Sequence, residues 1–306
     1  MSKKILIVAD EPGWIFERHA WEIRKRLTKY GSDIAFRKQA IPQMSQDYDL
    51  VYVMDPIPLS HGYPPQDKCI MGLRCEFLYK EHPNGALGLY ENGFPGRCVS
   101  IKDKCCAFHV VNRNQLEIFR NIVTDKPLFL AQHGIDEEVF CKDVVRNYDH
   151  RKIRVGTAGR SSPNKGFEII KTACQMADAE FVSQQYGAGK RSKENMPNFY
   201  QDIDAYVCMS KTEGLNNGIM EAGAMGLPVI STRSGAAEEI IKDGENGFLI
   251  DRTAEALSEA LMRLRDGGLR KSMGNKMSNE IRKNWTWAVK IKEFERMFDE
   301  YFELRK

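Results

Sequence analysis

Short apolar runs and amphipathic segments alternate along the chain. The run "KILIVA" at 4–9 predicts a buried strand, and "DIAFRKQ" at 33–39 and "YDLVYVMD" at 48–55 predict two more. A helix is predicted between the first two strands, because apolar side chains recur there at helical spacing: Ile15, Phe16, Ala20, Ile23 and Leu27. Gly31 is expected to end this helix. The order strand, helix, strand, strand is the opening of an open α/β sheet.

The pattern is less regular between residues 57 and 97, where Pro, Gly, His and Tyr are frequent. Three further strands are predicted in the first half, at 68–77, 105–112 and 128–136. A helix is predicted from Arg113 to about Asn121. The polar, mixed-charge segment 142–152 is the best linker candidate in the chain.

The alternation restarts after that segment. Strands are predicted at 153–159, 180–185, 205–210, 227–232 and 247–250. Helices are predicted at 165–177, 196–203, 217–226, 235–243, 254–264 and 287–305. The expected fold class is therefore α/β, with two successive Rossmann-like domains at 1–148 and 149–285 and a closing helix at 286–306.

Composition is consistent with this picture. The 306 residues suffice for two domains that each bury a core, and 42% hydrophobic and 28% charged residues are typical of a soluble globular protein. A net charge of +3 gives no support for nucleic acid as a partner. No window approaches eighteen apolar residues, and the apolar run in "MSKKILIVAD" is too short for a signal peptide, so we expect a cytoplasmic protein.

The eight cysteines form no C-x-x-C pair. A zinc site from Cys69, Cys75, Cys98 and Cys105 is an alternative, although the spacing fits no common template. Buried free thiols in a reducing compartment are the favoured interpretation, and no metal is expected.

Two loops of the second half follow predicted strands, where parallel sheets bind ligands. In "GTAGRSSPNKGFEII", Gly159 ends a strand, and Arg160 and Lys165 stand beside a helix start. Two cations in this place are able to reach one diphosphate. The alternative is a solvated loop with ordinary surface cations.

The second loop belongs to "TEGLNNGIMEAGAMGLPVIST" at 212–232. Glu213 precedes the predicted helix, and Glu221 lies inside it, facing the same crevice. A carboxylate would repel a phosphate bound nearby, so these glutamates are assigned to sugar hydroxyls instead. For hydroxyl groups a carboxylate is a strong hydrogen-bond acceptor. The first turn would come from Asn216, Asn217 and Gly218, with backbone N–H groups open to an anion.

The residues that follow Glu221 are small: Ala222, Gly223, Ala224 and Gly226. They are expected to let the helix lie close against the sheet. An alternative interpretation of the two glutamates is a helix-capping acid and an exposed helical Glu.

Together these stretches resemble the retaining glycosyltransferases of family 4 (glycosyl transferases group 1). The "GR…NKG" loop, the E-x7-E pair, "EAGAMGLPVIST", "SGAAEEI" and "DGENGFLI" stand in the order of that family. "LAQHGIDEEVF" resembles its interdomain turn, with His133 where Asn is usual, and "NWTWAVKIKEFERMFDEYF" its closing helix. The resemblance extends over 153–250 and less closely over 106–140 and 286–303.

The resemblance implies a GT-B fold, in which two Rossmann-like domains face a cleft and the C-terminal helix packs back on the first domain. It implies that Arg160 and Lys165 bind the diphosphate of a UDP- or GDP-sugar donor, that Glu221 binds the ribose and that Glu213 binds the donor sugar. Gly13 matches a glycine turn near the phosphates. The implied reaction is metal-independent transfer with retention of anomeric configuration, without a cofactor beyond the donor.

Some positions depart from the family pattern. Leu215 and Asn216 stand where Phe-Gly is common, and Gly13 is a single glycine in a usually longer turn. The family's first-domain histidine has no assigned counterpart among Arg74, Glu76 and His82. His109 stands in an apolar run and is expected in the core. The segment "GAGKRSKEN" lacks the third glycine of a dinucleotide-binding fingerprint, so it is not interpreted as an NAD site.

Two other functions stay open, a non-catalytic nucleotide-sugar-binding protein and a sugar-nucleotide epimerase. The acceptor is unidentified: a saccharide, a lipid-linked saccharide, a protein or a modified base, with nucleic acid disfavoured by charge. The end of the first predicted helix is basic, with Arg24, Lys25, Arg26 and Lys29. One hypothesis is that this helix end makes a weak peripheral contact with a membrane, and the alternative is an ordinary solvated helix face.

Overall fold

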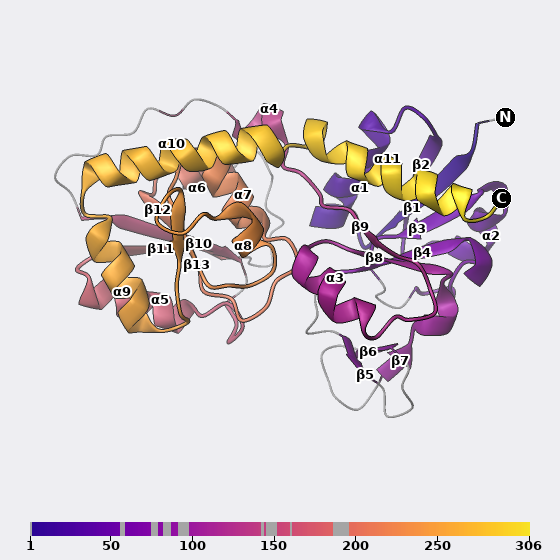
Figure 1. Cartoon of the computed structure of the whole chain (residues 1–306), viewed down its shortest axis with the longest axis horizontal. Helices are drawn as coiled ribbons and strands as arrows, with labels where there is room; N and C mark the ends of the chain where they lie inside the picture. Colours follow the sequence, from indigo (N-terminus) through magenta and orange to yellow (C-terminus); the bar gives the residue numbers. More distant parts are fainter. Residues whose placement is uncertain are drawn as a thin grey trace. The chain divides into compact units, whose positions relative to one another are not determined.

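The computed structural model describes residues 2–55, 59–74, 79–81, 87–90, 98–141, 144, 152–159, 161–185 and 196–306. Contacts divide the chain into two compact units (Figure 1). Unit 1 comprises Met1–His133 and Lys290–Lys306, and unit 2 comprises Gly134–Val289. The domain boundaries expected from the sequence, after residues 148 and 285, stay a prediction.

Unit 1 contains a sheet of six parallel strands in the order β2-β1-β3-β4-β8-β9. The strands are β1 (Lys4–Ala9), β2 (Gly31–Phe36), β3 (Leu50–Val53), β4 (Cys69–Leu73), β8 (Ala107–Val110) and β9 (Leu128–Leu130). The α-helices are α1 (Ile15–Arg26), α2 (Ile41–Met44), α3 (Arg113–Arg120) and most of α11 (Trp287–Glu303). The sequence pattern predicted all of these except the short α2.

The strands of this sheet present alternate side chains to opposite faces. One face packs in an apolar cluster with α2 and α3 that includes Leu6, Val51, Phe108 and Phe119. On the other face, the Tyr52 ring lies 6.3 Å from Phe294 and 5.8 Å from Phe298 of α11. The C-terminal helix therefore packs back on unit 1, as the family resemblance implied.

His109 lies in the core, as expected. Its Nδ1 is hydrogen-bonded to the Tyr52 hydroxyl at 2.8 Å and its Nε2 to the Ala131 carbonyl at 2.7 Å. Burial lowers the pKa of His109 well below its usual value, so the ring is neutral.

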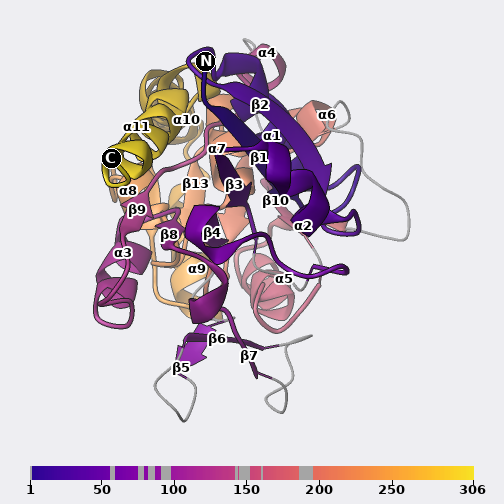
Figure 2. The ribbon, with the colours of Figure 1, turned by 90° about the vertical axis from the view of Figure 1, so that its right-hand side faces the viewer.

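A second sheet of unit 1 is small and antiparallel, with strands β5 (Tyr79–Glu81), β6 (Leu87–Tyr90) and β7 (Cys98–Ser100). Figures 1 and 2 both show it apart from the six-stranded sheet. The sequence pattern did not predict it, because Pro, Gly, His and Asn interrupt residues 78–97 and leave no clear apolar run or alternation there.

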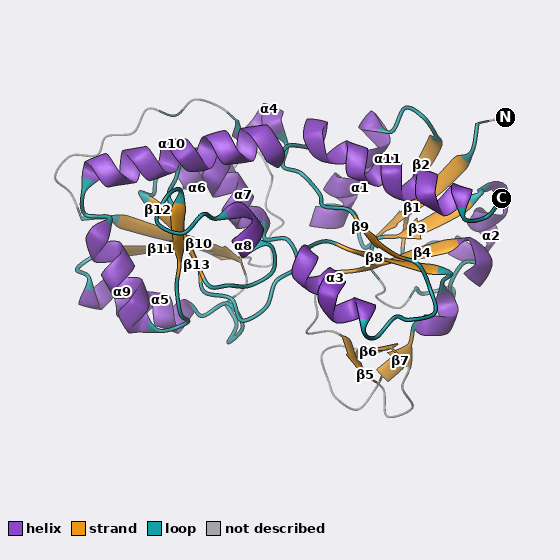
Figure 3. Cartoon of the chain, in the orientation of Figure 1, coloured by secondary structure: helices purple, strands orange, loops and turns teal. Residues whose placement is uncertain are grey.

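Unit 2 contains a parallel sheet in the order β11-β10-β12-β13-β14. The strands are β10 (Arg154–Gly159), β11 (Glu180–Gln185), β12 (Ala205–Cys208), β13 (Val229–Ser231) and β14 (Gly247–Leu249). The helices are α4 (Glu137–Phe140), α5 (Phe167–Met176), α6 (Met196–Gln201), α7 (Asn217–Ala224), α8 (Ala237–Ile240), α9 (Ala254–Arg263) and α10 (Gly267–Asn284). Helices α5 and α9 cover one side of the sheet, and α7 and α10 the other (Figure 3).

One of the small residues of α7, Gly223, has a different role from the expected one. A Cβ on Gly223 would lie 2.7 Å from Met277 Cγ of α10, so this glycine permits the close approach of α10, not of the sheet. Contact with the sheet comes from Gly218, where a Cβ would lie 2.0 Å from the Tyr206 hydroxyl oxygen of β12. Helix α10 was not predicted from the sequence.

The two segments near the junctions of the units lie side by side within unit 2. The Ile135 N–H donates to the Trp285 carbonyl at 2.9 Å, and the Trp287 N–H donates to the Ile135 carbonyl at 3.0 Å. A Cβ on Gly134 would lie 2.3 Å from the Thr286 carbonyl carbon. Only glycine allows the two segments to approach this closely.

Candidate functional site

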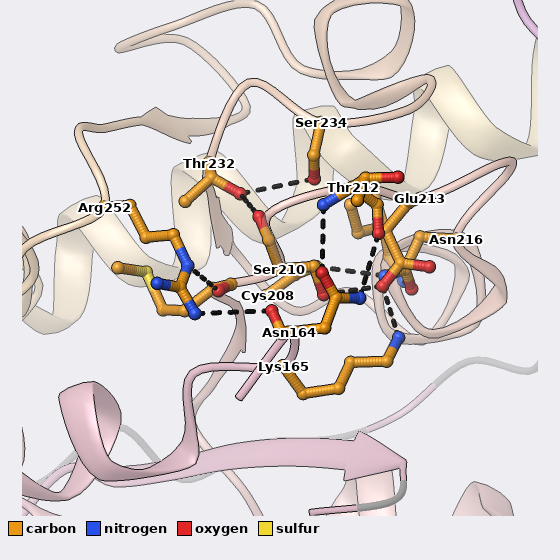
Figure 4. A network of polar contacts seen from close by, with 12 residues as sticks. Asn164, Lys165, Cys208, Ser210, Thr212, Glu213, Asn216, Thr232, Ser234 and Arg252 are labelled. Atoms are coloured by element: carbon orange, nitrogen blue, oxygen red, sulfur yellow. Dashed lines mark hydrogen bonds and ion pairs between the residues drawn. The ribbon is translucent and has the colours of Figure 1, made fainter. Parts of the chain in front are cut away.

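The candidate site lies where the neighbouring parallel strands β10 and β12 end. Because both strands run in the same direction, the loops that follow them meet at one edge of the sheet. There Lys165 Nζ forms an ion pair with Glu213 Oε1, although the two residues are 48 positions apart (Figure 4). The Lys165 and Glu213 side chains are 28% and 15% exposed, so a ligand has access to a pair that is partly shielded from water.

Glu213 is oriented by the ends of two strands. The Ser210 hydroxyl donates to Glu213 Oε1 at 2.5 Å, and the Thr232 hydroxyl donates to the Ser210 carbonyl at 2.6 Å (Figure 4). Gly235, at φ +59°, lies against the Glu213 backbone, where a Cβ would be 2.8 Å from the Glu213 carbonyl oxygen. The carboxylate is therefore held in place before any ligand binds.

The loop before α5 is fastened to the loop after β12. Asn164 Nδ2 donates to the Thr212 carbonyl at 3.2 Å, and the Thr212 N–H donates to Asn164 Oδ1 at 3.3 Å. The Lys211 N–H donates to the Asn164 carbonyl at 2.9 Å. These contacts flank Lys165 and Glu213 and keep the two loops adjacent.

Helix α7 starts with an N-cap. Asn216 Oδ1 accepts from the Ile219 N–H at 3.2 Å, and Asn216 Nδ2 donates to Cys208 Sγ at 3.0 Å. The Ile219 N–H is thus occupied, whereas the expected opening of the Asn216, Asn217 and Gly218 amides to an anion stays a prediction. The start of α5 differs, because its N-cap is Gly166, which has no side chain to cap the helix.

Glu221 lies inside α7 and is buried, with 9% of its surface exposed. The Tyr200 hydroxyl of α6 donates to Glu221 Oε2 at 2.7 Å. The alternative of an exposed helical Glu is therefore excluded for this residue.

Two buried titratable groups of the site, Cys208 and Tyr206, carry no charge. Burial raises the pKa of the Cys208 thiol, and the nearby Glu213 carboxylate raises it further. Burial also raises the pKa of Tyr206 well above its usual value. Both groups are neutral at physiological pH, and among the described side chains it is Lys165 that pairs with the Glu213 charge.

The other predicted site residues have varied positions. Gly159 ends β10 at φ +138°, a conformation that favours glycine, and Asn217 and Gly218 form the first turn of α7. Gly13, at φ +81°, lies in unit 1 and donates its N–H to Glu17. Arg160 lies outside the described residues.

Several residues of this site were not predicted: Asn164, Tyr200, Ser210, Thr232 and Arg252. Ser210 and Thr232 could have been found from their places at strand ends. Asn164, Tyr200 and Arg252 have no local signal, because their role depends on which loops the fold brings together.

Among the candidates for the family's first-domain histidine, Arg74 is buried in unit 1. Its Nη2 donates to the Tyr52 hydroxyl at 2.7 Å, and its Nε donates to the Met54 carbonyl at 2.5 Å. Glu76 and His82 lie outside the described residues.

In the part of the chain that the structure describes, no cluster of three or more His, Cys, Asp or Glu side chains could hold a metal ion. The zinc alternative is untested, because the Cys75 and Cys98 side chains are not among those described. None of the helices in the described ranges has the length and apolarity needed to cross a membrane.

Comparison with known proteins gives one family. The family model for glycosyl transferases group 1 matches residues 138–266. An uncharacterized glycosyltransferase of Methanocaldococcus jannaschii is 28% identical over 60% of this chain and 55% of its own length. A trehalose synthase of Pyrococcus horikoshii is 27% identical over 62% of this chain and 48% of its own length. The chain thus spans about half the length of these two relatives.

Solved structures share the fold over nearly the whole chain. Sucrose-phosphate synthase from Thermosynechococcus elongatus has a TM-score of 0.73, with 14% identity, over 99% of this chain and all of that one. Anabaena HepE in complex with UDP and glucose has a TM-score of 0.73, with 13% identity, over 97% of this chain and all of that one. The chain thus has two parallel Rossmann-like sheets and a GT-B fold, and its residues 138–266 belong to the glycosyl transferase group 1 family.

Proposed function

We propose that this protein transfers a sugar from a nucleotide-diphosphate sugar to an acceptor, with retention of anomeric configuration. The observation that carries the proposal is the Lys165–Glu213 ion pair at the carboxyl edge of a parallel sheet, beside the start of α5. A cation, a carboxylate and a helix N-terminus together match a ligand that contains both a diphosphate and a sugar. The UDP and glucose in Anabaena HepE support such a ligand.

The proposed role of Lys165 concerns the leaving group. As the bond to the sugar breaks, negative charge builds on the nucleoside diphosphate. Lys165, with Arg160 and the N-terminal amides of α5, would stabilise that charge without a metal. In the structure Lys165 is paired with Glu213. Donor binding would therefore replace the Glu213 carboxylate by the diphosphate as the partner of Lys165, and would leave Glu213 to contact the donor sugar.

The proposed roles of the two glutamates differ. Glu213, once separated from Lys165, would accept hydrogen bonds from the donor sugar near the reacting carbon. Glu221, with one carboxylate oxygen fixed by Tyr200, would accept from the ribose hydroxyls. Gly13 and Gly159 would line the donor phosphates, and Asn216, Asn217 and Gly218 would fix the start of α7.

The test of this function is turnover. Incubation with UDP-glucose or a GDP-sugar should release the nucleoside diphosphate, slowly with water and faster with a suitable acceptor, and NMR of the product should show the donor's anomeric configuration. Nucleotide binding without release of the diphosphate would favour the non-catalytic alternative. An interconverted donor sugar with no transfer would favour the epimerase.

A weak peripheral membrane contact is a further proposal for the basic end of α1. Here Arg24 lies over the Trp21 ring at 5.1 Å, and Trp21 is 50% exposed, a combination suited to an anionic interface. Lys29 pairs with Asp299 at 2.7 Å, which reduces the charge available. We expect the protein to sediment with anionic vesicles at low salt but not at high salt. Equal amounts of protein in the supernatant with and without vesicles at low salt would contradict the proposal.

A further inference from the structure

Arg252 joins the two loops of the candidate site. It follows β14 in the chain and is half-buried. Its Nε donates to the Met209 carbonyl at 2.8 Å, and its Nη2 donates to the Pro163 carbonyl at 2.7 Å and the Asn164 carbonyl at 3.4 Å. Figure 4 shows the guanidinium between the two loops, with its contacts at their backbones.

The two loops lead directly to the charged pair. Asn164 precedes Lys165 in the chain, and Met209 precedes Ser210, whose hydroxyl orients Glu213. One guanidinium therefore connects the backbone beside the cation with the backbone beside the carboxylate.

Glycine makes this connection possible. Gly166 has φ +68°, and a Cβ there would lie 2.7 Å from the Met209 carbonyl oxygen and 3.1 Å from Arg252 Nη2. The loop that carries Lys165 is thus drawn as close to the end of β12 as the backbone allows. The planar fork of a guanidinium fixes the carbonyls that it binds relative to each other, which a lysine ammonium does not do.

We propose that Arg252 is a positioning residue, which sets the Lys165 ammonium where it meets the diphosphate of the donor while Glu213 stays within reach of the sugar. This inference rests on the proposed function. The hydrogen bonds of Arg252 go to backbone carbonyls, and this role accounts for them. The affinity for the diphosphate would then depend on Arg252, although the Arg252 side chain would not touch the diphosphate.

The test is a double-mutant cycle on nucleotide binding. Arg252→Ala and Arg252→Lys are each made alone and together with Lys165→Ala, and the Kd for UDP and GDP is measured by calorimetry. The control is Arg233→Ala, which removes another arginine of unit 2 from an exposed ion pair with Glu238 at 3.0 Å. Thermal unfolding of each variant shows that it is folded, and Arg252→Lys keeps the charge if Arg252→Ala does not fold.

We expect both Arg252 variants to weaken binding of the preferred nucleoside diphosphate by about tenfold, within the range of coupling between residues of one network. In the Lys165→Ala background the same changes should weaken it by less than about twofold, because the group that Arg252 positions is gone. Arg233→Ala should change neither value.

Two outcomes would overturn the positioning role alone. An equal loss in both backgrounds would mean that Arg252 acts on the fold or on the ligand directly, and wild-type affinity in Arg252→Lys would mean that the guanidinium geometry is not needed. If neither nucleotide binds the wild-type chain, or if Lys165→Ala leaves binding unchanged, the proposed function itself fails.

Discussion

Glu213→Gln is expected to lower kcat by about a hundredfold, a loss of the size measured when one electrostatically stabilising group is removed from an active site. The donor sugar gains positive charge as its bond to the diphosphate breaks, so a carboxylate near the reacting carbon stabilises the transition state more than the ground state. Gln keeps the size of the side chain and one acceptor oxygen, but it removes the charge and replaces the other oxygen by an NH2 donor.

The same variant should bind nucleoside diphosphate as well as the wild type or more tightly. In the structure Lys165 is paired with Glu213, so an incoming diphosphate competes with that carboxylate for the ammonium. The measurements are steady-state kinetics with the donor and calorimetry with UDP or GDP. Full kcat in Glu213→Gln would contradict the assignment, as would a loss confined to nucleotide affinity.

Glu221→Ala should have the opposite kinetic signature, with the donor KM raised by about tenfold and kcat nearly kept. The proposed ribose contact is distant from the reacting carbon, so it contributes equally to the ground state and the transition state. Glu221 is buried, and its removal leaves the Tyr200 hydroxyl without this acceptor. A stability loss is therefore expected as well, and thermal unfolding must accompany the kinetics.

Tyr200→Phe is the matched control for that variant. It keeps the ring and Glu221 but removes the 2.7 Å hydrogen bond that fixes the carboxylate. We expect a smaller rise in KM than for Glu221→Ala, again with kcat kept. A fall in kcat for Glu221→Ala with an unchanged KM would show that the roles of the two glutamates have been assigned in reverse.

The sequence predicted the elements whose apolar pattern is long or continuous. Both parallel sheets, α1, α3, α5 and α11 were expected close to where they lie. Helix α10 was missed because it begins with two glycines, and its apolar side chains are few: Leu269, Met273, Met277 and Ile281. Such a stripe becomes meaningful only when its partner is known, here Gly223 of α7.

The site was predictable to the same extent. The rule that ligands bind at the carboxyl ends of parallel strands was sufficient to bring Lys165 and Glu213 to one edge. It was not sufficient to predict that they form an ion pair or that Asn216 caps α7, because both depend on the path of each loop. Arg252 was beyond prediction, since its contacts reach backbone carbonyls 43 and 89 positions away.

The return of α11 to unit 1 affects the order in which the protein can fold during synthesis. Phe294 and Phe298 cover the face of the first sheet that contains Tyr52, yet they are translated only after all of unit 2. At usual elongation rates the ribosome needs roughly ten to thirty seconds to pass from Gly134 to the end of α11. During that time unit 2, which is continuous in sequence, can complete its core, whereas the nascent unit 1 still exposes the part of its sheet that α11 covers, a hydrophobic surface of the kind that favours aggregation.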